Sequence, residues 1–233
     1  MADERAQTPA MPVSPAGTSG ARMIVVLGTI GLVCGALIVG AFQVTLPAIT
    51  KNKAKLLEES VLAVVPNATR ARPFVDNGGV LAPADDAGVP GTRYYAGYNE
   101  RGELVGVAIE TSGQGFADVV RVIYGYSPEK QAIVGLKVLE SHETPGLGTK
   151  IETEARFRAN FDSLKVVPSA DGGALQHPIA LAKRGEKTDP WQVEAITGAT
   201  ISSRAVADML RASTETAVPL IVRNLDALKG GAP

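Results

Sequence analysis

The sequence predicts an α+β fold, in which a single N-terminal transmembrane helix precedes one domain with a largely antiparallel sheet and flanking helices. Three observations predict it. No charged residue occurs from Met23 to Thr50. Short segments rich in β-branched and aromatic residues follow in pairs around turn residues, as in hairpins. Apolar residues at helical spacing occur between and after these pairs, so helices are interspersed with hairpin-connected strands.

Composition limits what the chain can do. It has 233 residues and a formal net charge of -1. This length accommodates one membrane anchor and one compact domain, and the near-neutral charge argues against a nucleic-acid partner. A single cysteine, Cys34, cannot form an internal disulfide, an ordinary zinc site or an iron–sulfur cluster, and we expect it to be a small buried hydrophobe. No metal site is therefore expected, and any redox chemistry needs an organic cofactor.

The N-terminal region predicts a tail and an anchor. Residues 1–22 are rich in Pro, Ser, Ala and Gly and predict a disordered tail. Residues 23–47 predict the transmembrane helix, because their apolar core reaches roughly 30 Å at 1.5 Å per residue. The run is too long for a signal peptide and lacks a convincing cleavage site. Small residues four apart, such as Gly31 and Gly35, suit a helix partner in the membrane, although glycine is common in such helices anyway.

The charge pattern around the span gives a contrary topology cue. Arg5 and Arg22 precede the span, whereas Lys51, Lys53 and Lys55 follow it. The positive-inside rule alone would place the C-terminal domain in the cytoplasm, but the rule weakens for long translocated domains.

The middle of the chain divides into a connector and two hairpins. Residues 48–91 predict an amphipathic helix ending near Pro66, followed by a linker from Pro73 to Gly91 that is dense in Pro, Gly and Asp. Strand pairs are expected at 92–98 with 103–110, and at 119–126 with 131–139.

The remainder of the domain, taken as residues 92–228, contains further elements before a short tail at 229–233. A helix is expected over 152–162, with short strands near 179–182 and 191–196. The last helix is expected from about Ser202, where Val206, Met209 and Leu210 belong to a buried stripe.

The most informative segment is Glu194-Ala-Ile-Thr-Gly-Ala-Thr-Ile-Ser-Ser203. A strand ends near Ile196, a tight turn passes through Gly198, and a helix begins beyond Thr200. Helix N-termini favour anions, so the Thr200 hydroxyl would lie beside an anion site. The alternative is that these hydroxyl residues only cap the helix, as Ser and Thr commonly do.

The segment Thr197-Gly-Ala-Thr200 resembles the flavinylation motif of the FMN-binding domain family. The pattern of that motif is an acidic residue, two variable positions, and then Ser/Thr-Gly-Ala-Thr. The resemblance implies that Thr200 carries FMN through a covalent phosphoester bond. The acidic position is Glu194, where the family more often has Asp. A second segment, Glu140-Ser-His-Glu-Thr-Pro-Gly-Leu-Gly148, resembles the loop that lines the flavin pocket of the same family.

The two motifs together imply a set of cofactor-binding residues beside the Thr200 attachment site, and no catalytic residue. That set is Thr197, Gly198, Ala199, Ser203, Glu143, Thr144, Gly146, Leu147 and Gly148. Trp191, Tyr124 and Tyr126 could stack on the flavin, but buried aromatic core is the alternative we favour. A solvated or structural role is favoured for His142 and His177.

In layout the chain is similar to the G subunits (RnfG) of the Rnf-type ion-translocating oxidoreductases. These share anchor, fold and flavin linkage with the C subunits of the sodium-pumping NADH:quinone oxidoreductases. The resemblance implies an electron-relay component of a ferredoxin:NAD oxidoreductase complex rather than a complete enzyme. It also implies a single-pass protein of the bacterial inner membrane with a periplasmic FMN domain, other membrane subunits as partners, and a flavin transferase for maturation. Two alternatives stay open, the sodium-pumping paralogue and a flavin-free tethered assembly protein.

Overall fold

The computed structural model describes residues 20–84 and 92–231 of the chain. The chain forms two compact units, Met1–Asn52 and Lys53–Pro233.

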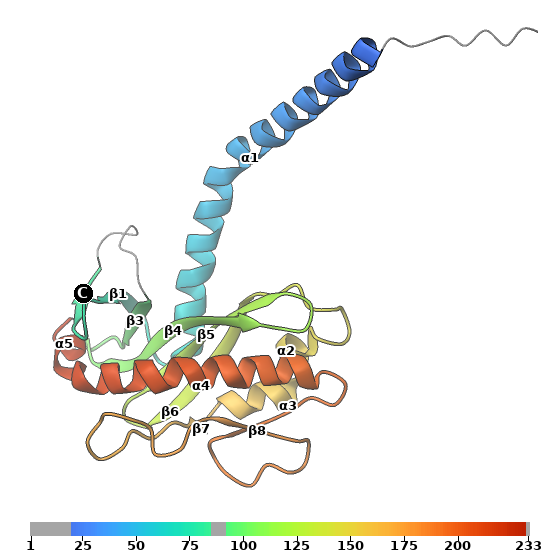
Figure 1. Cartoon of the computed structure of the whole chain (residues 1–233). Helices are drawn as coiled ribbons and strands as arrows, with labels where there is room; N and C mark the ends of the chain where they lie inside the picture. Colours follow the sequence, from blue (N-terminus) through green and yellow to red (C-terminus); the bar gives the residue numbers. More distant parts are fainter. Residues whose placement is uncertain (1–19, 85–91, 232–233) are drawn as a thin grey trace, which may run out of the picture. The chain divides into compact units, whose positions relative to one another are not determined.

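Figure 1 follows the elements in chain order. They are α1 (Gly20–Val64), β1 (Arg70–Asp76), β2 (Leu81–Pro83), β3 (Arg93–Tyr98), β4 (Leu104–Gln114), β5 (Val119–Ser127), β6 (Ala132–Glu140), α2 (Lys150–Thr153), α3 (Ala155–Arg158), η1 (Ala159–Phe161), β7 (Leu164–Lys165), β8 (Ala180–Ala182), β9 (Gln192–Glu194), α4 (Thr200–Arg223) and α5 (Leu225–Lys229).

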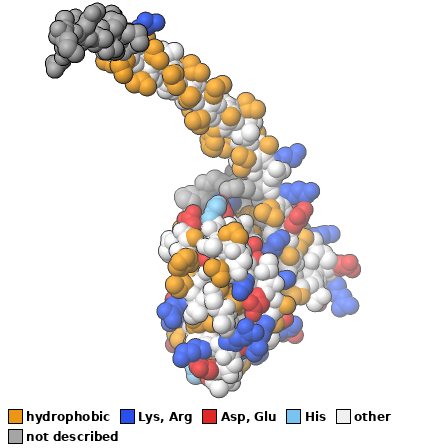
Figure 2. Space-filling model, turned by 90° about the vertical axis from the view of Figure 1, so that its right-hand side faces the viewer, with side chains coloured by type: hydrophobic (Ala, Val, Ile, Leu, Met, Phe, Trp, Pro, Cys, Tyr) orange, Lys and Arg blue, Asp and Glu red, His pale blue; other side chains and the backbone are white. Residues whose placement is uncertain are grey.

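Helix α1 contains the apolar segment. An 18-residue window of it has a mean hydropathy of 2.5 and no side chain buried within the chain, so by length and composition it could cross a membrane. Hydrophobic side chains cover the face of this segment seen in Figure 2. The Thr29 hydroxyl donates to the Val25 carbonyl at 2.8 Å, so the polar atom in the apolar core is satisfied. Cys34 is exposed on this helix, not buried as expected.

The helix does not stop after the apolar segment. The sequence predicted a span and a separate amphipathic helix, but α1 is continuous through Pro47 to Val64. Of the predicted tails, residues 1–19 and 232–233 lie outside the described part, while residues 20–22 already belong to α1.

The main sheet has seven strands in the order β2-β1-β3-β4-β5-β6-β7, and each neighbouring pair is antiparallel. Both predicted hairpins, β3–β4 and β5–β6, are confirmed. The short strands β8 and β9 pair in parallel as a separate two-stranded sheet. The α+β class with a largely antiparallel sheet is therefore confirmed.

The linker prediction was wrong for part of its range. Strands β1 and β2 occupy residues 70–76 and 81–83, so residues 73–76 and 81–83 of the segment expected to be irregular are strands, while residues 85–91 lie outside the described part. Phe74 and Leu81 are both almost fully buried, and this burial outweighs the turn-forming composition. Pro73 is tolerated because it lies at the end of the β1–β2 pairing, where its carbonyl accepts from the Ala84 N–H at 2.9 Å and no N–H of residue 73 is needed.

The helix expected over 152–162 is interrupted. Glu154 has an extended backbone (ψ 110°) and separates α2 from α3, which continues into the 3-10 turn η1. Ile151, Phe157 and Phe161 are buried, and the two Phe rings meet edge to face at 5.3 Å. Tertiary packing of these three side chains thus selects two short turns instead of one helix.

The two faces of the sheet carry different partners. Helix α4 lies across one face (Figure 1), where Val206 and Leu210 join a core cluster with Val122 and Tyr124. On the opposite face, the last turn of α1 contributes to a smaller cluster. Its buried members are Val61, Val64, Val65, Tyr95, Ala108 and Ile123.

The last turn of α1 approaches the sheet closely because four adjacent strands present a glycine there. This glycine row is Gly97, Gly106, Gly125 and Gly135. A Cβ added at Gly135 would lie 2.6 Å from the Val64 carbonyl oxygen, and one at Gly125 would collide with the same atom. The side chain of Val65 fills the space above Gly97 and Gly106. The glycine row therefore creates the flat surface of the sheet against which the end of α1 packs.

Candidate functional site

A cavity of about 290 Å³ opens at the N-terminus of α4. It is formed by the β4–β5 loop, the loop after β6 and the turn before α4. The lining residues are Phe116, Thr144, Leu147, Gly148, Gly198, Ala199, Thr200, Ile201 and Ser202. Segments far apart in sequence thus meet where the sequence predicted a site.

The turn between β9 and α4 is stabilised by the backbone conformation of Gly198 and by hydrogen bonds of the Ser203 side chain. Gly198 has φ +84°, a left-handed conformation that glycine adopts without strain, and nothing lies within 4 Å of where its Cβ would be. The Ser203 hydroxyl accepts from the Ile196 N–H at 3.0 Å and donates to the Ala199 carbonyl at 2.9 Å. Ser203 is fully buried, so its side chain stabilises the turn and does not line the cavity.

Thr200 is the first residue of α4, and its side chain is exposed at the cavity. Within the described part of the chain, no hydrogen bond is formed by its hydroxyl. The N–H groups of the first helical turn have no partner within the helix, and the helix dipole makes this end electropositive. The Ser203 N–H already bonds the Ala199 carbonyl at 2.9 Å, so the open donors belong to the residues before it. An anion beside Thr200 would meet these donors.

The carboxylate of Glu143 connects the three segments of the site. Glu143 is only 4% exposed. One oxygen accepts from the Ala117 N–H at 2.9 Å, and the other accepts from the Ser202 hydroxyl. Burial alone raises the pKa of Glu143, but the hydrogen bonds from Ser202 and from backbone N–H groups of the β4–β5 loop outweigh burial and lower the pKa. The carboxylate is thus ionised and engaged within the protein.

Two glycines make room for this carboxylate. A Cβ at Gly115 or at Gly148 would collide with a carboxylate oxygen of Glu143. Gly148 is itself buried and lines the cavity. The glycine at the end of the loop motif therefore has a defined physical role, which is to let the loop close over the Glu143 side chain.

The loop after β6 is a compact turn. The Leu147 N–H donates to the Thr144 carbonyl at 3.1 Å, and the Gly146 N–H donates to the Thr149 hydroxyl at 3.0 Å. Gly146 has φ +75°, again a conformation that favours glycine. These bonds leave the Leu147 side chain 51% exposed at the cavity.

The acidic position of the flavinylation motif lies away from the cavity. Glu194 forms an ion pair with Arg156 at 3.0 Å and accepts from the Gly185 N–H at 2.6 Å. The Gly185 hydrogen bond is the main cause that lowers the pKa of Glu194, with Arg156 adding to it. Glu194 therefore ties α3 and the β8–β9 connection to the strand that precedes the Thr200 turn.

The predicted site residues separate into two groups in the structure. Those that line the cavity are Thr144, Leu147, Gly148, Gly198, Ala199 and Thr200. The others, Glu143, Gly146, Thr197 and Ser203, lie within the same segments without being part of the lining. Sequence reasoning missed Phe116 and Ile201 as lining residues, and it placed the Ser202 hydroxyl near the anion site without including Ser202 in the cofactor-binding set. Phe116 is 63% exposed, and an aromatic residue between Gly115 and Ala117 was the available signal.

The aromatic and histidine candidates lie outside the cavity lining. Tyr124 and Tyr126 are fully buried in the core, which confirms the structural interpretation of both. Trp191 stacks on His177 with centroids 4.0 Å apart. His142 is exposed, 3.7 Å from the Asp118 carboxylate.

Comparisons with known proteins agree with this site. Residues 115–215, which contain both loop segments and Thr200, match the FMN-binding domain family. The G subunit of an ion-translocating oxidoreductase complex from Methanosarcina acetivorans is 31% identical over 194 residues, covering 83% of this chain and 92% of that protein. The chain belongs to this RnfG family. The corresponding protein of Haemophilus influenzae strain 86-028NP is 29% identical over 208 residues, covering 89% of this chain and 92% of the relative.

Solved structures share the fold of this RnfG family member. NqrC of Shewanella oneidensis matches with a TM-score of 0.60 at 19% identity, covering 78% of this chain and all of that one. The C subunit of the Na⁺-translocating NADH-quinone reductase from Parabacteroides distasonis matches with a TM-score of 0.56 at 20% identity, covering 73% of this chain and 92% of the other. Membership of the RnfG family is therefore confirmed, and the similarity to the C subunits is confirmed at the level of the fold.

Proposed function

We propose that the chain is a membrane-anchored electron-transfer subunit of an Rnf-type ion-translocating ferredoxin:NAD oxidoreductase, with FMN joined to Thr200 by a phosphoester bond. The observation that carries the proposal is the exposed Thr200 hydroxyl at the first position of α4, on a cavity within the segment that matches the FMN-binding domain family. Membership of the RnfG family supports the assignment to an ion-translocating complex.

The cavity fits the proposed cofactor in three respects. The open N–H groups at the start of α4 suit a phosphate. The side chains of Phe116, Leu147 and Ile201 supply apolar surface for a flat ring system. Gly198 leaves space beside the attachment hydroxyl because nothing lies within 4 Å of its absent Cβ. When bound, FMN would supply the exchange of electrons in pairs or singly, which joins two-electron to one-electron centres.

The residues of the chain then have defined tasks. Thr200 holds the cofactor covalently, and the start of α4 neutralises the remaining phosphate charge. Glu143 fixes the two loops against α4 through Ala117 and Ser202, so that the apolar lining keeps its position. No side chain of the cavity lining is an acid, a base or a thiol, which suits a relay site better than a site of substrate chemistry.

The attachment itself requires a transferase and FAD. The Thr200 oxygen forms a bond to the phosphorus of the FMN half of FAD, the pyrophosphate P–O bond breaks, and AMP leaves. The hydroxyl proton passes to solvent or to a base of the transferase. Since no base of this chain is hydrogen-bonded to Thr200 within the described residues, activation of the hydroxyl is assigned to the partner enzyme.

We further propose that α1 anchors the chain as a single span of the bacterial inner membrane and that the FMN domain lies on the periplasmic side. Its apolar window and its unburied side chains support the anchor. The lysines after the span argue the other way, so topology needs its own test. A reporter fused after Pro233 is expected to be active only outside the cytoplasm, and activity only inside would contradict the assignment.

The decisive experiment is intact and peptide mass spectrometry on protein purified from its native host. One FMN, joined with loss of water, is expected on the peptide that contains Thr200. Thr200→Ala should abolish the adduct. Thr153→Ala is the matched control, because Thr153 is an exposed helical threonine whose hydroxyl only contacts the Thr149 carbonyl at 3.4 Å.

An unmodified Thr200 peptide, isolated from cells that contain the transferase, would contradict the covalent linkage. If the protein then also lacked bound flavin, the second candidate function would replace electron transfer. That second function is a flavin-free protein that holds an assembly together. Flavin retained without a bond to Thr200 would keep the relay function and remove only the linkage.

A further inference from the structure

One edge of the main sheet is open. Strand β6 pairs with β5 along its whole length, but β7 pairs only with Ala132 and Ile133 at its start. Within the described residues, no strand pairs with the outer edge of β6 from Val134 to Glu140. Such an edge presents unpaired N–H and C=O groups at every second residue.

The usable part of this edge is short and regular. The β5–β6 register shifts at both ends, between Gly125 and Tyr126 and between Arg121 and Val122. Between the two shifts, Gly135–Val138 form an uninterrupted ladder with β5. At about 3.3 Å per residue, this stretch matches a partner strand of about four residues. We call Gly135–Val138 the open edge.

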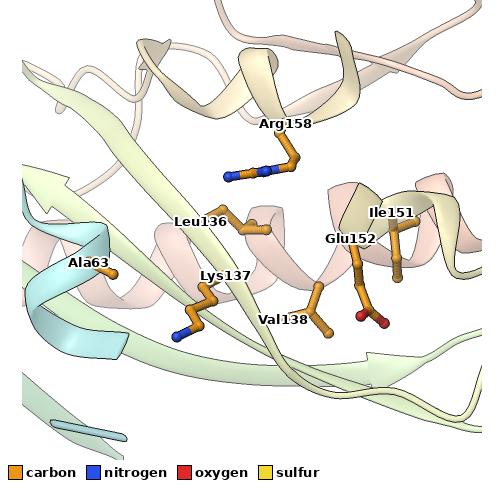
Figure 3. A pocket seen from close by; sticks show the side chains of 7 residues that line it. All are labelled: Ala63, Leu136, Lys137, Val138, Ile151, Glu152 and Arg158. Atoms are coloured by element: carbon orange, nitrogen blue, oxygen red, sulfur yellow. The ribbon is translucent and has the colours of Figure 1, made fainter. Parts of the chain in front are cut away.

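A cavity of about 410 Å³ lies along the open edge. Leu136, Lys137 and Val138 of β6 line it, and Figure 3 shows Leu136 and Val138 on the side of α2 and α3, whereas Lys137 extends from the other side of the strand. Ala63, in the last turn of α1, closes one end, and the buried side chain of Ile151 lies at the other. The cavity therefore offers room for side chains of a strand added to β6.

The charged side chains of this cavity have no ion-pair partner among the described residues. Lys137 and Arg158 both line it, and neither forms an ion pair with any described residue. In Figure 3 the Arg158 guanidinium extends over Leu136, while the Glu152 carboxylate lies toward Val138 and Ile151. Arg158 thus lies toward the Leu136 end of the cavity, and Glu152 toward the Val138 end.

We infer that the open edge is a docking site for an extended segment of another polypeptide, which adds a short strand to β6 and carries a carboxylate beside Arg158. Backbone hydrogen bonds to the edge would supply affinity, and the cavity would select an aliphatic side chain between Leu136 and Ile151. Symmetric antiparallel pairing of two copies would set the Leu136 end of one open edge against the Val138 end of the other, so a second copy is the competing occupant, and the identity of the crosslinked peptide distinguishes the two.

The test uses the full chain in its assembly, extracted from native membranes, compared with the full chain purified alone in detergent. Hydrogen exchange of the Gly135–Val138 amides is expected to be slower by at least about tenfold in the assembly, because an added strand protects them. A benzophenone side chain introduced at Ala63, which is exposed and lines the cavity, is then photoactivated and the joined peptide sequenced. The inference expects one peptide of a different protein of the assembly, containing Asp or Glu.

Charge variants complete the test. Arg158→Glu should reduce the yield of that adduct by about two- to fivefold or more, as for loss of an exposed ion pair. Arg101→Glu, at the exposed β3–β4 turn, makes the same charge change away from the cavity and should leave the yield unchanged. Flavin content serves as the check that each variant is folded. Equal exchange in both preparations, an adduct only to a second copy, or an adduct only to lipid would each overturn the inference.

Discussion

At the residue scale, the site depends on a buried carboxylate that makes no contact with the cavity itself. Glu143 accepts hydrogen bonds from the β4–β5 loop and from α4, and Gly115 and Gly148 make room for it. The loop motif therefore encodes hydrogen bonds that hold the loops to α4, in addition to a surface that lines the cavity. An acidic residue in a flavin motif suggests cofactor contact from sequence, whereas its hydrogen bonds indicate a structural task.

The stability of the domain should depend on pH because of the hydrogen bonds to the Glu143 carboxylate. The folded-state pKa of Glu143 lies below the ordinary glutamate value of 4.5, so its stabilisation is fully present above that value. The stabilisation is lost as pH falls through the lower folded-state pKa. Glu143→Gln should reduce the free energy of unfolding by about 1.5–3 kcal/mol at neutral pH, the range for hydrogen bonds to a charged group.

Urea unfolding at pH 7 and pH 3 would measure the effect. The difference between the parent and Glu143→Gln should be largest at pH 7 and smaller at pH 3. Glu129→Gln, at an exposed glutamate of the β5–β6 turn, should change stability little at either pH. A difference that stays constant with pH would show that the carboxylate charge is not what stabilises the loops.

The turn before α4 provides a second residue-scale prediction. Gly198→Ala should lower the free energy of unfolding by about 1–2 kcal/mol, the cost of a left-handed conformation for a residue with a Cβ. The space around Gly198 is open, so no steric clash adds to this cost. Gly198→Asn should cost less, because Asn tolerates positive φ. Equal losses of stability for Gly198→Ala and Gly198→Asn in thermal unfolding would argue that the loss does not come only from the backbone conformation.

At the element scale, the glycine row determines how the end of α1 packs. Gly125→Ala would place a methyl group against the Val64 carbonyl and should destabilise the domain by about 1–3 kcal/mol through overpacking. Denaturant unfolding of the full chain would measure this loss. Gly113→Ala in β4 is the comparison, because the nearest atoms to its Cβ would be side-chain atoms of Met209, at 3.1 Å and 3.2 Å. A larger loss of stability for Gly113→Ala than for Gly125→Ala would contradict the role of the glycine row in packing the end of α1.

Several elements could be predicted from local pattern, and others could not. The hairpins β3–β4 and β5–β6 have alternating or β-branched runs around turn residues, so local chemistry specifies them. Strands β1 and β2 have turn-rich composition, and only burial of Phe74 and Leu81 against the rest of the domain makes them strands. The split between α2 and α3 likewise follows from packing of Phe157 and Phe161, which no local pattern reveals.

At the scale of the whole molecule, the two compact units imply that residues 53–233 can fold without the apolar segment. Removal of residues 1–52 should leave the thermal midpoint of residues 53–233 nearly unchanged, because that unit contains its own core. Removal of residues 1–66 should lower stability by roughly 5 kcal/mol, since Val61, Val64 and Val65 are lost at about 1.5 kcal/mol or more each. Thermal and urea unfolding of both truncations measures this. Equal stability of the two would show that the end of α1 does not stabilise the domain.

Local sequence pattern was enough to predict the α+β class, the apolar helix, the two central hairpins and the position of the Thr200 turn. These features depend on local periodicity, turn chemistry and short motifs, which are readable without knowing which segments meet. Only the tertiary structure decided that Glu143 bonds Ser202, that Phe116 joins the cavity, that Ser203 supports a turn, and that β6 has an open edge. Each of these depends on contacts between distant segments, and the free energy of such contacts is set by burial and hydrogen bonding in the folded chain.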